Sequence, residues 1–344
     1  MTRDRILLVQ TGFLGDIILT TPLVAALRRA RPDTELWMMV TPAGAPLVAA
    51  HPDLDGVLVD DKRGADRGIA GFARLVRKLR RADVTIAIAA HKSVRTALGL
   101  RAAGIPRRIG FASAPAAALY SERVVRPAAV HDRDRLLALL APFAIAAVDA
   151  ETAHPRVALD TATRGRARAL LAARVGGLPL AALCPGSAWR TKRWPPRAFA
   201  ALARALAADG YGCLLLGSPD ERGLTAEVHA AAGGATIDLG GATDLPLLAA
   251  LLAEAAVVVS NDSAPMHLAS AADVPQVAVF CATTPGQGYG PLGRRAEVVE
   301  RDLACRPCGR HGGARCPRGT DDCMELVTVD EVRAAVARVR TRAA

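Results

Sequence analysis

The chain has 344 residues, which is too long for one ordinary hydrophobic core and fits two domains of about 150 residues each. A hydrophobic fraction of 51% excludes a disordered protein, and no apolar run is long enough for a signal peptide or a membrane span. The formal net charge of +11 favours an anionic partner, which the charge leaves open as nucleic acid, a phosphorylated substrate or an acidic membrane surface.

The seven cysteines, without a secretory signal, are expected to be reduced. We therefore predict a cytoplasmic protein, and its charge is compatible with a peripheral position on the inner face of the cytoplasmic membrane.

Short apolar runs alternate with helical stretches in the first half of the chain. Residues 5–10 predict a buried strand, 11–15 a glycine-containing turn and 17–29 a helix. The alternation continues with strands at 34–40, 57–60, 84–89 and 107–111, and with helices at 43–50, 69–81, 93–103 and 132–146. Such an order is typical of a parallel sheet covered by helices on both faces.

The second half repeats this pattern after a mixed polar linker at 148–163. Its predicted strands are 180–184, 212–216, 236–239, 257–259 and 277–280, and its predicted helices are 195–208, 221–232, 245–254 and a helix that begins near 264. We therefore predict two doubly wound, Rossmann-like domains, 1–160 and 161–328. A last helix at 329–340, within the segment 329–344, lies beyond the second sheet and could pack back on the first domain.

Polar and glycine residues follow the strands of the second domain. Gly186, Ser187, Thr191 and Lys192, with Arg190 and Arg193 beside them, come after the strand at 180–184 and suit a diphosphate. Asn261, Asp262, Ser263 and His267 gather around a helix start, where unpaired N–H groups favour a phosphate or a polar sugar. Either group could instead serve only to cap a helix or fill the core.

Asp16 lies at the start of the first helix, after the turn at 11–15. The helix dipole favours its ionised form there, so it could accept a proton from a hydroxyl, or it could simply cap the helix. The turn lacks the full G-x-G-x-x-G spacing, which argues against a dinucleotide cofactor.

Several separated motifs resemble glycosyltransferase family 9, the ADP-heptose:lipopolysaccharide heptosyltransferases. These motifs, in the expected order, are LGDIILTTP at 14–22, KSVRTALGLRAAGIPRRIGF at 92–111, PGSAWRTKRWP at 185–195, GSPDE at 217–221 and SNDSAPMHLA at 260–269. The resemblance implies a GT-B architecture, in which two Rossmann-like domains face each other across a cleft. It also implies inverting, metal-independent transfer of a heptose from an ADP-sugar to the inner core of lipopolysaccharide.

By this resemblance the first domain binds the acceptor and the second binds the nucleotide-sugar donor. Asp16 would be the general base, Lys192 would neutralise the diphosphate and Glu221 would hold the ribose. The remaining donor-binding residues would be Gly186, Ser187, Thr191, Asp262, Ser263, Ala264 and His267, and the acceptor-binding residues Gly15, Lys92, Arg95, Arg107 and Arg108. Ala264 departs from the family pattern, which generally has glycine there.

We expect no required cofactor, since the ADP-sugar is a substrate, and no catalytic metal. The D-x-D pairs Asp53/Asp55 and Asp132/Asp134 are better explained as caps. Four cysteines near the C-terminus favour a reduced structural cluster over a metal site, and they are only a weak zinc candidate because one close pair is present: Cys305, Cys308, Cys316 and Cys323.

Two rival functions remain open at this stage. One keeps the GT-B fold for an epimerase or for a transferase that uses another nucleotide sugar. The other is a basic nucleic-acid-binding protein, which would need cationic and aromatic side chains interleaved on one face. The three Trp and three Tyr show no such pattern, so we do not expect nucleic acid as a partner.

Overall fold

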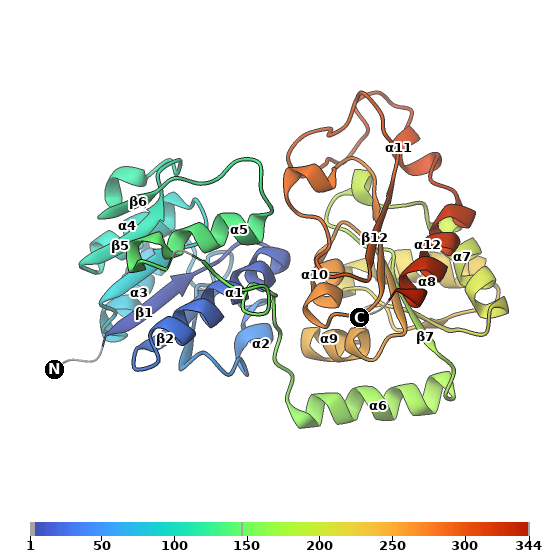
Figure 1. The fold of residues 1–344 in the computed structure, drawn as a ribbon, viewed down its shortest axis with the longest axis horizontal. Coiled ribbons are helices and arrows are strands. Elements are labelled where there is room, and N and C mark those ends of the chain that lie inside the picture. Colours follow the sequence, from blue (N-terminus) through green and yellow to red (C-terminus); the bar gives the residue numbers. More distant parts are fainter. Residues whose placement is uncertain (1–3, 146, 343–344) are drawn as a thin grey trace. The chain divides into compact units, whose positions relative to one another are not determined.

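The structure is a computed structural model that describes residues 4–145 and 147–342. The chain divides into two compact units, Met1–Ala158 and Leu159–Ala344 (Figure 1). Each unit contains one six-stranded parallel sheet with helices packed on it, so the doubly wound α/β prediction is confirmed. No helix in the described ranges is both long enough and apolar enough to cross a membrane.

The sheet of the first unit has the strand order β3-β2-β1-β4-β5-β6. Its central strands are apolar and buried on both faces, as helix-covered parallel strands must be. Its strands are β1 Arg5–Val9, β2 Glu35–Val40, β3 Gly56–Val59, β4 Ile86–Ala89, β5 Arg107–Phe111 and β6 Glu122–Val124. Its helices are α1 Leu14–Ala30, α2 Ala45–Val48, α3 Gly68–Arg81, α4 Val94–Ala102 and α5 Asp132–Leu137. Helix α1 contacts α5, and α3 contacts α4.

The second unit repeats this plan, with the strand order β12-β11-β10-β7-β8-β9. Its strands are β7 Leu180–Cys184, β8 Gly212–Leu215, β9 Ile237–Asp238, β10 Val257–Asn261, β11 Gln276–Phe280 and β12 Ala296–Glu300. Its helices are α6 Thr161–Val175, α7 Pro196–Ala208, α8 Arg222–Ala232, α9 Leu245–Ala253, α10 Ala264–Ala271, α11 Asp322–Glu325 and α12 Val329–Thr341.

Each sheet has one point at which the chain order reverses. In the first unit this point lies between β1 and β4, and in the second it lies between β7 and β10. Loops that leave two adjacent strands in opposite directions open a crevice there, which is where doubly wound sheets bind ligands. The residues that follow β1, β4, β7 and β10 are therefore the first to consider for function.

Helix boundaries near the middle of the chain differ from the prediction. The helix expected at 132–146 ends as α5 at Leu137 and continues as a 3-10 helix, Ala138–Phe143, because Pro142 cannot donate a backbone hydrogen bond. Residue 146 lies outside the described residues. The linker expected at 148–163 overlaps α6, whose N-cap Asp160 accepts a hydrogen bond from the backbone N–H of Thr163 at 2.6 Å.

The last helix, α12, belongs to the second unit. Its apolar face, Val332, Ala335, Val336 and Val339, is buried in the hydrophobic core of that unit. There α12 packs against α7, β11 and β12, and a further contact with the first domain stays a prediction. The helical spacing of these four residues matches one continuous stripe, which the core of the second unit covers.

Candidate functional site

The first unit places Asp16 in the first turn of α1, just after the loop that follows β1 and next to the reversal point. The Asp16 carboxylate accepts a hydrogen bond from the backbone N–H of Phe13 at 3.1 Å, so it caps α1. Gly12 makes room for it, because a Cβ at that position would lie 2.6 Å from Asp16 Oδ2. A carboxylate has about four acceptor positions, so this capping role is compatible with a second role as a base.

A hydrogen-bonded network around His91 holds the loop between β1 and α1. His91, just after β4, contacts the hydroxyls of Thr11 and Thr96 through Nε2, both at 3.1 Å, and the carbonyl of Val9 through Nδ1. The pattern assigns the proton to Nδ1, since a carbonyl can only accept. Burial lowers the pKa of His91 to about 4, so this histidine is neutral near pH 7.

Lys62 is a member of this site that the sequence did not reveal. It follows β3, and its Nζ donates to the carbonyl of Thr11 at 2.5 Å. Burial lowers the pKa of Lys62, while the nearby carboxylate of Asp60 opposes that effect. Its position in the chain, far from the residues of the turn, gave no local signal.

The predicted acceptor residues divide into two groups. Gly15, Lys92 and Arg95 lie in segments that follow β1 and β4, at the carboxyl edge of the first sheet. Arg95 forms an ion pair with the buried Asp60 at 3.0 Å and lies over the ring of Phe72.

Arg107 and Arg108 are the first two residues of β5 and therefore lie at the amino edge of the parallel sheet, so their contact with an acceptor stays a prediction. Arg107 pairs with Glu122 at 2.6 Å, and Arg108 donates to the carbonyl of Leu119 at 2.9 Å. Both guanidinium groups therefore stabilise that edge, and the structure does not bring them together with Gly15, Lys92 and Arg95.

The second unit brings Lys192 and Asp262 together at its own reversal point. Lys192 follows β7 and Asp262 follows β10, and Lys192 Nζ lies 2.6 Å from Asp262 Oδ2 in a mostly buried ion pair. The same Oδ2 accepts a hydrogen bond from the hydroxyl of Thr283 at 2.6 Å, and the buried Ser187 hydroxyl lies 3.5 Å from the Asp262 carbonyl. These residues come from three separate loops.

The loop that follows β7 is tied down on both sides of Lys192. The side chain of Asn261 donates to the carbonyl of Pro185 at 2.7 Å and accepts from the backbone N–H of Trp194 at 2.9 Å. Arg193 donates to the carbonyl of Ser187, and Arg190 forms a two-pronged pair with Asp321 at 3.0 Å. The two arginines expected beside Lys192 therefore have structural partners already.

Gly186 and Glu221 lie against each other at the ends of β7 and β8. Glu221 Oε2 accepts hydrogen bonds from the backbone N–H and the hydroxyl of Ser218, at 2.9 and 3.0 Å. A Cβ at Gly186 would lie only 2.1 Å from Glu221 Oε1, so the carboxylate needs glycine at this position. The predicted ribose-binding acid is thus held in place by the first loop of the same unit.

Helix α10 begins next to the Lys192–Asp262 pair. Ser263 is its N-cap residue and Ala264 its first residue, while His267 is buried in its second turn. The first N–H groups of a helix have no partner within the helix, and Pro265 supplies none. The start of α10 therefore presents a partial positive charge next to the ion pair.

The segment between β12 and α11 adds residues that the sequence motifs do not include. Thr191 is locked to Gly313, because its hydroxyl donates to the Gly313 carbonyl at 3.0 Å and accepts from the Gly313 N–H at 2.8 Å. A direct contact of this hydroxyl with a ligand stays a prediction. His311, two residues earlier, has a pKa lowered by burial and by the neighbouring Arg310 and Lys192, whereas Asp262 raises it.

The four C-terminal cysteines carry free thiols, and Cys323 is buried. Burial raises the pKa of the Cys308 thiol, and Cys305 and Cys316 raise it further, so these thiols lie near one another. Within residues 4–145 and 147–342, no group of three or more His, Cys, Asp or Glu side chains could hold a metal ion. The D-x-D residues have structural roles: Asp55 pairs with Arg28, and Asp132 pairs with Arg126.

Two Rossmann-like units with polar loops at both reversal points define a GT-B fold. A family model described as glycosyltransferase family 9 (heptosyltransferase) matches residues 72–314. The chain therefore belongs to glycosyltransferase family 9 and is a glycosyltransferase.

Individual relatives cover nearly the whole chain. The lipopolysaccharide heptosyltransferase 1 of Pseudomonas aeruginosa is 29% identical over 321 residues, which are 88% of this chain and 86% of the relative. A glycosyl transferase family 9 structure from Veillonella parvula has a TM-score of 0.87 and 24% identity and covers 99% and 98% of the two chains. The structure of ADP-heptose lps heptosyltransferase II from E. coli has a TM-score of 0.79 and 23% identity and covers 98% of each chain.

Proposed function

We propose that this glycosyltransferase moves a heptose from ADP-heptose to the inner core of lipopolysaccharide, with inversion at the anomeric carbon and without a metal ion. Membership of the family and the names of relatives that align over most of both chains support the donor and acceptor classes. The observation that carries the proposal is the buried Lys192–Asp262 pair beside the start of α10, at the reversal point of the second sheet.

The proposed donor site lies in the second unit. Lys192 and the start of α10 at Ser263 stabilise the negative charge that ADP gains as it leaves. Glu221 holds the two ribose hydroxyls, a role for which a fixed carboxylate at the end of the second strand is suited. The site for the sugar and the phosphates is lined by six further residues: Gly186, Ser187, Thr191, Asp262, Ala264 and His267.

The proposed chemistry is a single displacement. The carboxylate of Asp16 takes the proton of an acceptor hydroxyl as its oxygen forms a bond to the anomeric carbon, and the bond from that carbon to the diphosphate oxygen breaks. One displacement inverts the configuration at the anomeric carbon, ADP leaves, and the proton stays on Asp16 until it passes to solvent. Because Asp16 and Lys192 lie in different units, turnover requires both units to hold their substrates together.

The first unit binds the acceptor in this proposal. Lys92 and Arg95 supply positive charge to an acceptor that carries phosphates and acid sugars. Gly15, next to Asp16, has no side chain and lets the acceptor come close to the backbone. Such an acceptor is anchored in a membrane, so we further propose that the enzyme acts in the cytoplasm as a peripheral protein on the inner face of the cytoplasmic membrane.

Replacing Asp16 with Asn tests the assignment of the base. Asn keeps an oxygen that can accept the Phe13 N–H, so α1 stays capped, but it cannot take a proton. We expect kcat to fall by about 10²- to 10⁴-fold while the affinity for ADP-heptose is unchanged. The rate of product formation, followed by mass spectrometry, measures kcat, and calorimetry measures the affinity for ADP-heptose. A panel of other nucleotide sugars in the same assay tests which donor is used. Full turnover in the variant would remove Asp16 from the role.

A further inference from the structure

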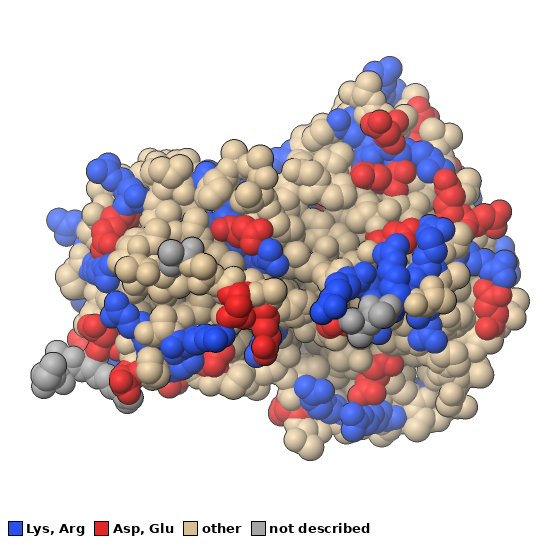
Figure 2. Space-filling model, in the orientation of Figure 1, with Lys and Arg blue, Asp and Glu red and all other residues tan. Residues whose placement is uncertain are grey.

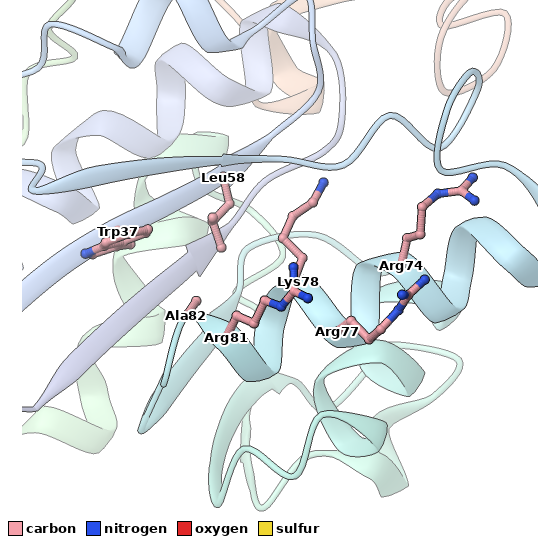
Figure 3. Close-up of a pocket in the computed structure, with 7 residues that line it drawn as sticks. All are labelled: Trp37, Leu58, Arg74, Arg77, Lys78, Arg81 and Ala82. Atoms are coloured by element: carbon pink, nitrogen blue, oxygen red, sulfur yellow. The ribbon is translucent and has the colours of Figure 1, made fainter.

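A groove of about 460 Å³ lies in the first unit between α3 and the strands β2 and β3 (Figure 3). Trp37, Leu58 and Ala82 line it with apolar surface, and four cationic side chains of α3 complete it: Arg74, Arg77, Lys78 and Arg81. Their i, i+3, i+4 and i+7 spacing places all four on one face of the helix. We call these four residues the α3 cationic stripe.

The stripe carries more positive charge than its neighbours neutralise. Lys78 and Arg74 share the buried Asp66, at 3.2 and 3.7 Å. Within the part of the chain that the structure describes, Arg77 and Arg81 take part in no ion pair or hydrogen bond, and both are exposed. One carboxylate therefore faces four cations, which leaves a local excess of positive charge.

The basic side chains that gather over α12 in Figure 2 are different. There Arg333 pairs with Asp209, and Arg338 and Arg342 both pair with Glu297. Those arginines stabilise the surface of the second unit. The α3 cationic stripe, with two cations that have no such partner, is the better candidate for binding something outside the chain.

The neighbours of the aromatic residue in the groove argue against a nucleic acid as the partner. A base would have to stack on an aromatic ring, and Trp37 is the aromatic residue of the groove. Its ring already has the guanidinium of Arg5 over it at 4.9 Å, and Gly56 lies so close that a Cβ there would meet the ring at 2.7 Å. Trp37 is therefore unable to take a base between those neighbours.

An exposed apolar residue on the same helix also favours a membrane. Ile69, in the first turn of α3, is 92% exposed. Ile69 lies about one to three turns before the cations of the stripe, so it adds an exposed apolar group at the amino end of the same helix, and such groups can enter a membrane surface. Leu58, which is only partly buried in the groove, adds apolar surface below the charges.

We propose that the α3 cationic stripe and its groove dock the enzyme onto the phosphate headgroups of an anionic lipid bilayer. The stripe runs from the middle of α3 to its last residue, Arg81, toward the amino edge of the sheet, whereas Asp16 lies at the carboxyl edge, so docking leaves the carboxyl edge accessible. The inference deepens the proposed function, in which the acceptor is membrane-borne. Its test measures binding and not transfer, so the two proposals can fail separately.

The test is cosedimentation of the full chain with vesicles of phosphatidylcholine, with and without phosphatidylglycerol. We expect binding only to the anionic vesicles, and we expect added salt to weaken it. The double variant Arg77→Glu/Arg81→Glu should bind them roughly tenfold more weakly or worse, since each basic residue near an anionic surface contributes separately. Arg77→Gln/Arg81→Gln should lose an intermediate amount. Ile69→Ser should weaken binding without changing its dependence on salt.

The matched control carries the same charge change on the second unit. Arg174 and Arg294 are exposed, and Arg174→Glu/Arg294→Glu should bind the anionic vesicles like the unaltered chain. Equal losses in both double variants would show a general effect of net charge and overturn the proposal. It would also be overturned if the unaltered chain ignored anionic vesicles, or if random duplex DNA bound the stripe with submicromolar affinity while vesicles did not. Circular dichroism checks that each variant is folded.

Discussion

Gly186 illustrates how one missing methyl group can set the position of a carboxylate, here that of Glu221, which we propose holds the ribose. Alanine at this position would place its Cβ on Glu221 Oε1, and Glu221 would have to leave Ser218. We expect Gly186→Ala to weaken ADP binding by about 10- to 150-fold, because one hydrogen bond to a charged group is worth roughly 1.5–3 kcal/mol. Isothermal titration calorimetry with ADP measures the change.

Gly223, on α8, provides the matched control. No atom lies within 4 Å of a Cβ built there, and an exposed helix position favours alanine over glycine by roughly 0.5–1 kcal/mol. Gly223→Ala should therefore bind ADP normally and unfold at a slightly higher temperature. If both variants bound ADP equally well, the proposal that Gly186 positions Glu221 for ADP binding would be wrong.

His91 predicts a pH dependence for the stability of the first unit. Burial lowers its folded pKa from 6.5 to about 4, so the unfolded chain binds the proton more readily. The stabilisation is complete above pH 6.5 and is lost as the pH falls toward 4, by up to about 3 kcal/mol at 1.4 kcal/mol per pH unit. Urea unfolding at several pH values measures it.

The variant His91→Gln isolates this contribution. Glutamine cannot take up a proton, so the dependence of the unfolding free energy on pH should become shallower by up to one proton. His51, whose pKa is also lowered by burial, keeps its own contribution in both proteins. Identical slopes with and without His91 would contradict the assignment.

Individual side-chain partners are the part of the site that the sequence predicted least well. Lys192 and Asp262 could be placed together, because each follows a buried strand and parallel strands share one carboxyl edge. The position of Arg107 and Arg108 at the amino edge of the first sheet was not foreseen, because a motif that spans a strand does not say at which end of it a residue lies. Lys62 and His311 reach their sites from distant segments and gave no local pattern.

At the scale of elements, the two strands that the sequence did not predict, β6 and β12, are both edge strands, whereas the other two edge strands, β3 and β9, were predicted. The central strands β1, β4, β7 and β10 are short apolar runs with polar turns after them. Edge strands β6 and β12 carry charged residues, Glu122, Arg123 and Glu297 among them, because one side of an edge strand faces solvent. Because of these charged residues, β6 and β12 do not form the apolar runs by which the other strands were predicted.

Helix α6 was missed for a related reason. It contains four arginines and buries only Thr163, Ala167 and Val175, so its apolar stripe is narrow. It contacts α9, and two of its arginines, Arg166 and Arg168, pair with Asp244 and Glu254. Tertiary contacts of this kind favour a helix that its own sequence specifies weakly.

At the scale of the whole molecule, the boundaries of the second unit lead to a prediction about fragments. The fragment 159–344 contains a complete sheet and core, whereas 159–328 lacks α12 and exposes the core around Val332, Val336 and Val339. Exposing three valines costs about 5 kcal/mol, at roughly 1.5–3 kcal/mol each, which is a large share of the stability of a domain.

We therefore expect 159–344 to unfold cooperatively and to bind ADP, and 159–328 to aggregate or to unfold without a sharp transition. Thermal unfolding by circular dichroism and calorimetry with ADP distinguish these outcomes, with the full chain as the reference. A shorter fragment that folds and binds ADP as well as the longer one would contradict the role of α12 in the core.

The ion pair between Lys192 and Asp262 has one more consequence. Without a ligand, the ammonium group of Lys192 already pairs with the Asp262 carboxylate at 2.6 Å. An anion that replaces this carboxylate therefore gains only the difference between its own interaction energy with Lys192 and that of Asp262. A weakly charged metabolite or a chloride ion offers less than the carboxylate does and gains nothing by displacing it. If Lys192 binds the diphosphate as proposed, we expect that only a group with more than one negative charge, such as a pyrophosphate, makes the exchange favourable, and that singly charged anions inhibit the enzyme weakly.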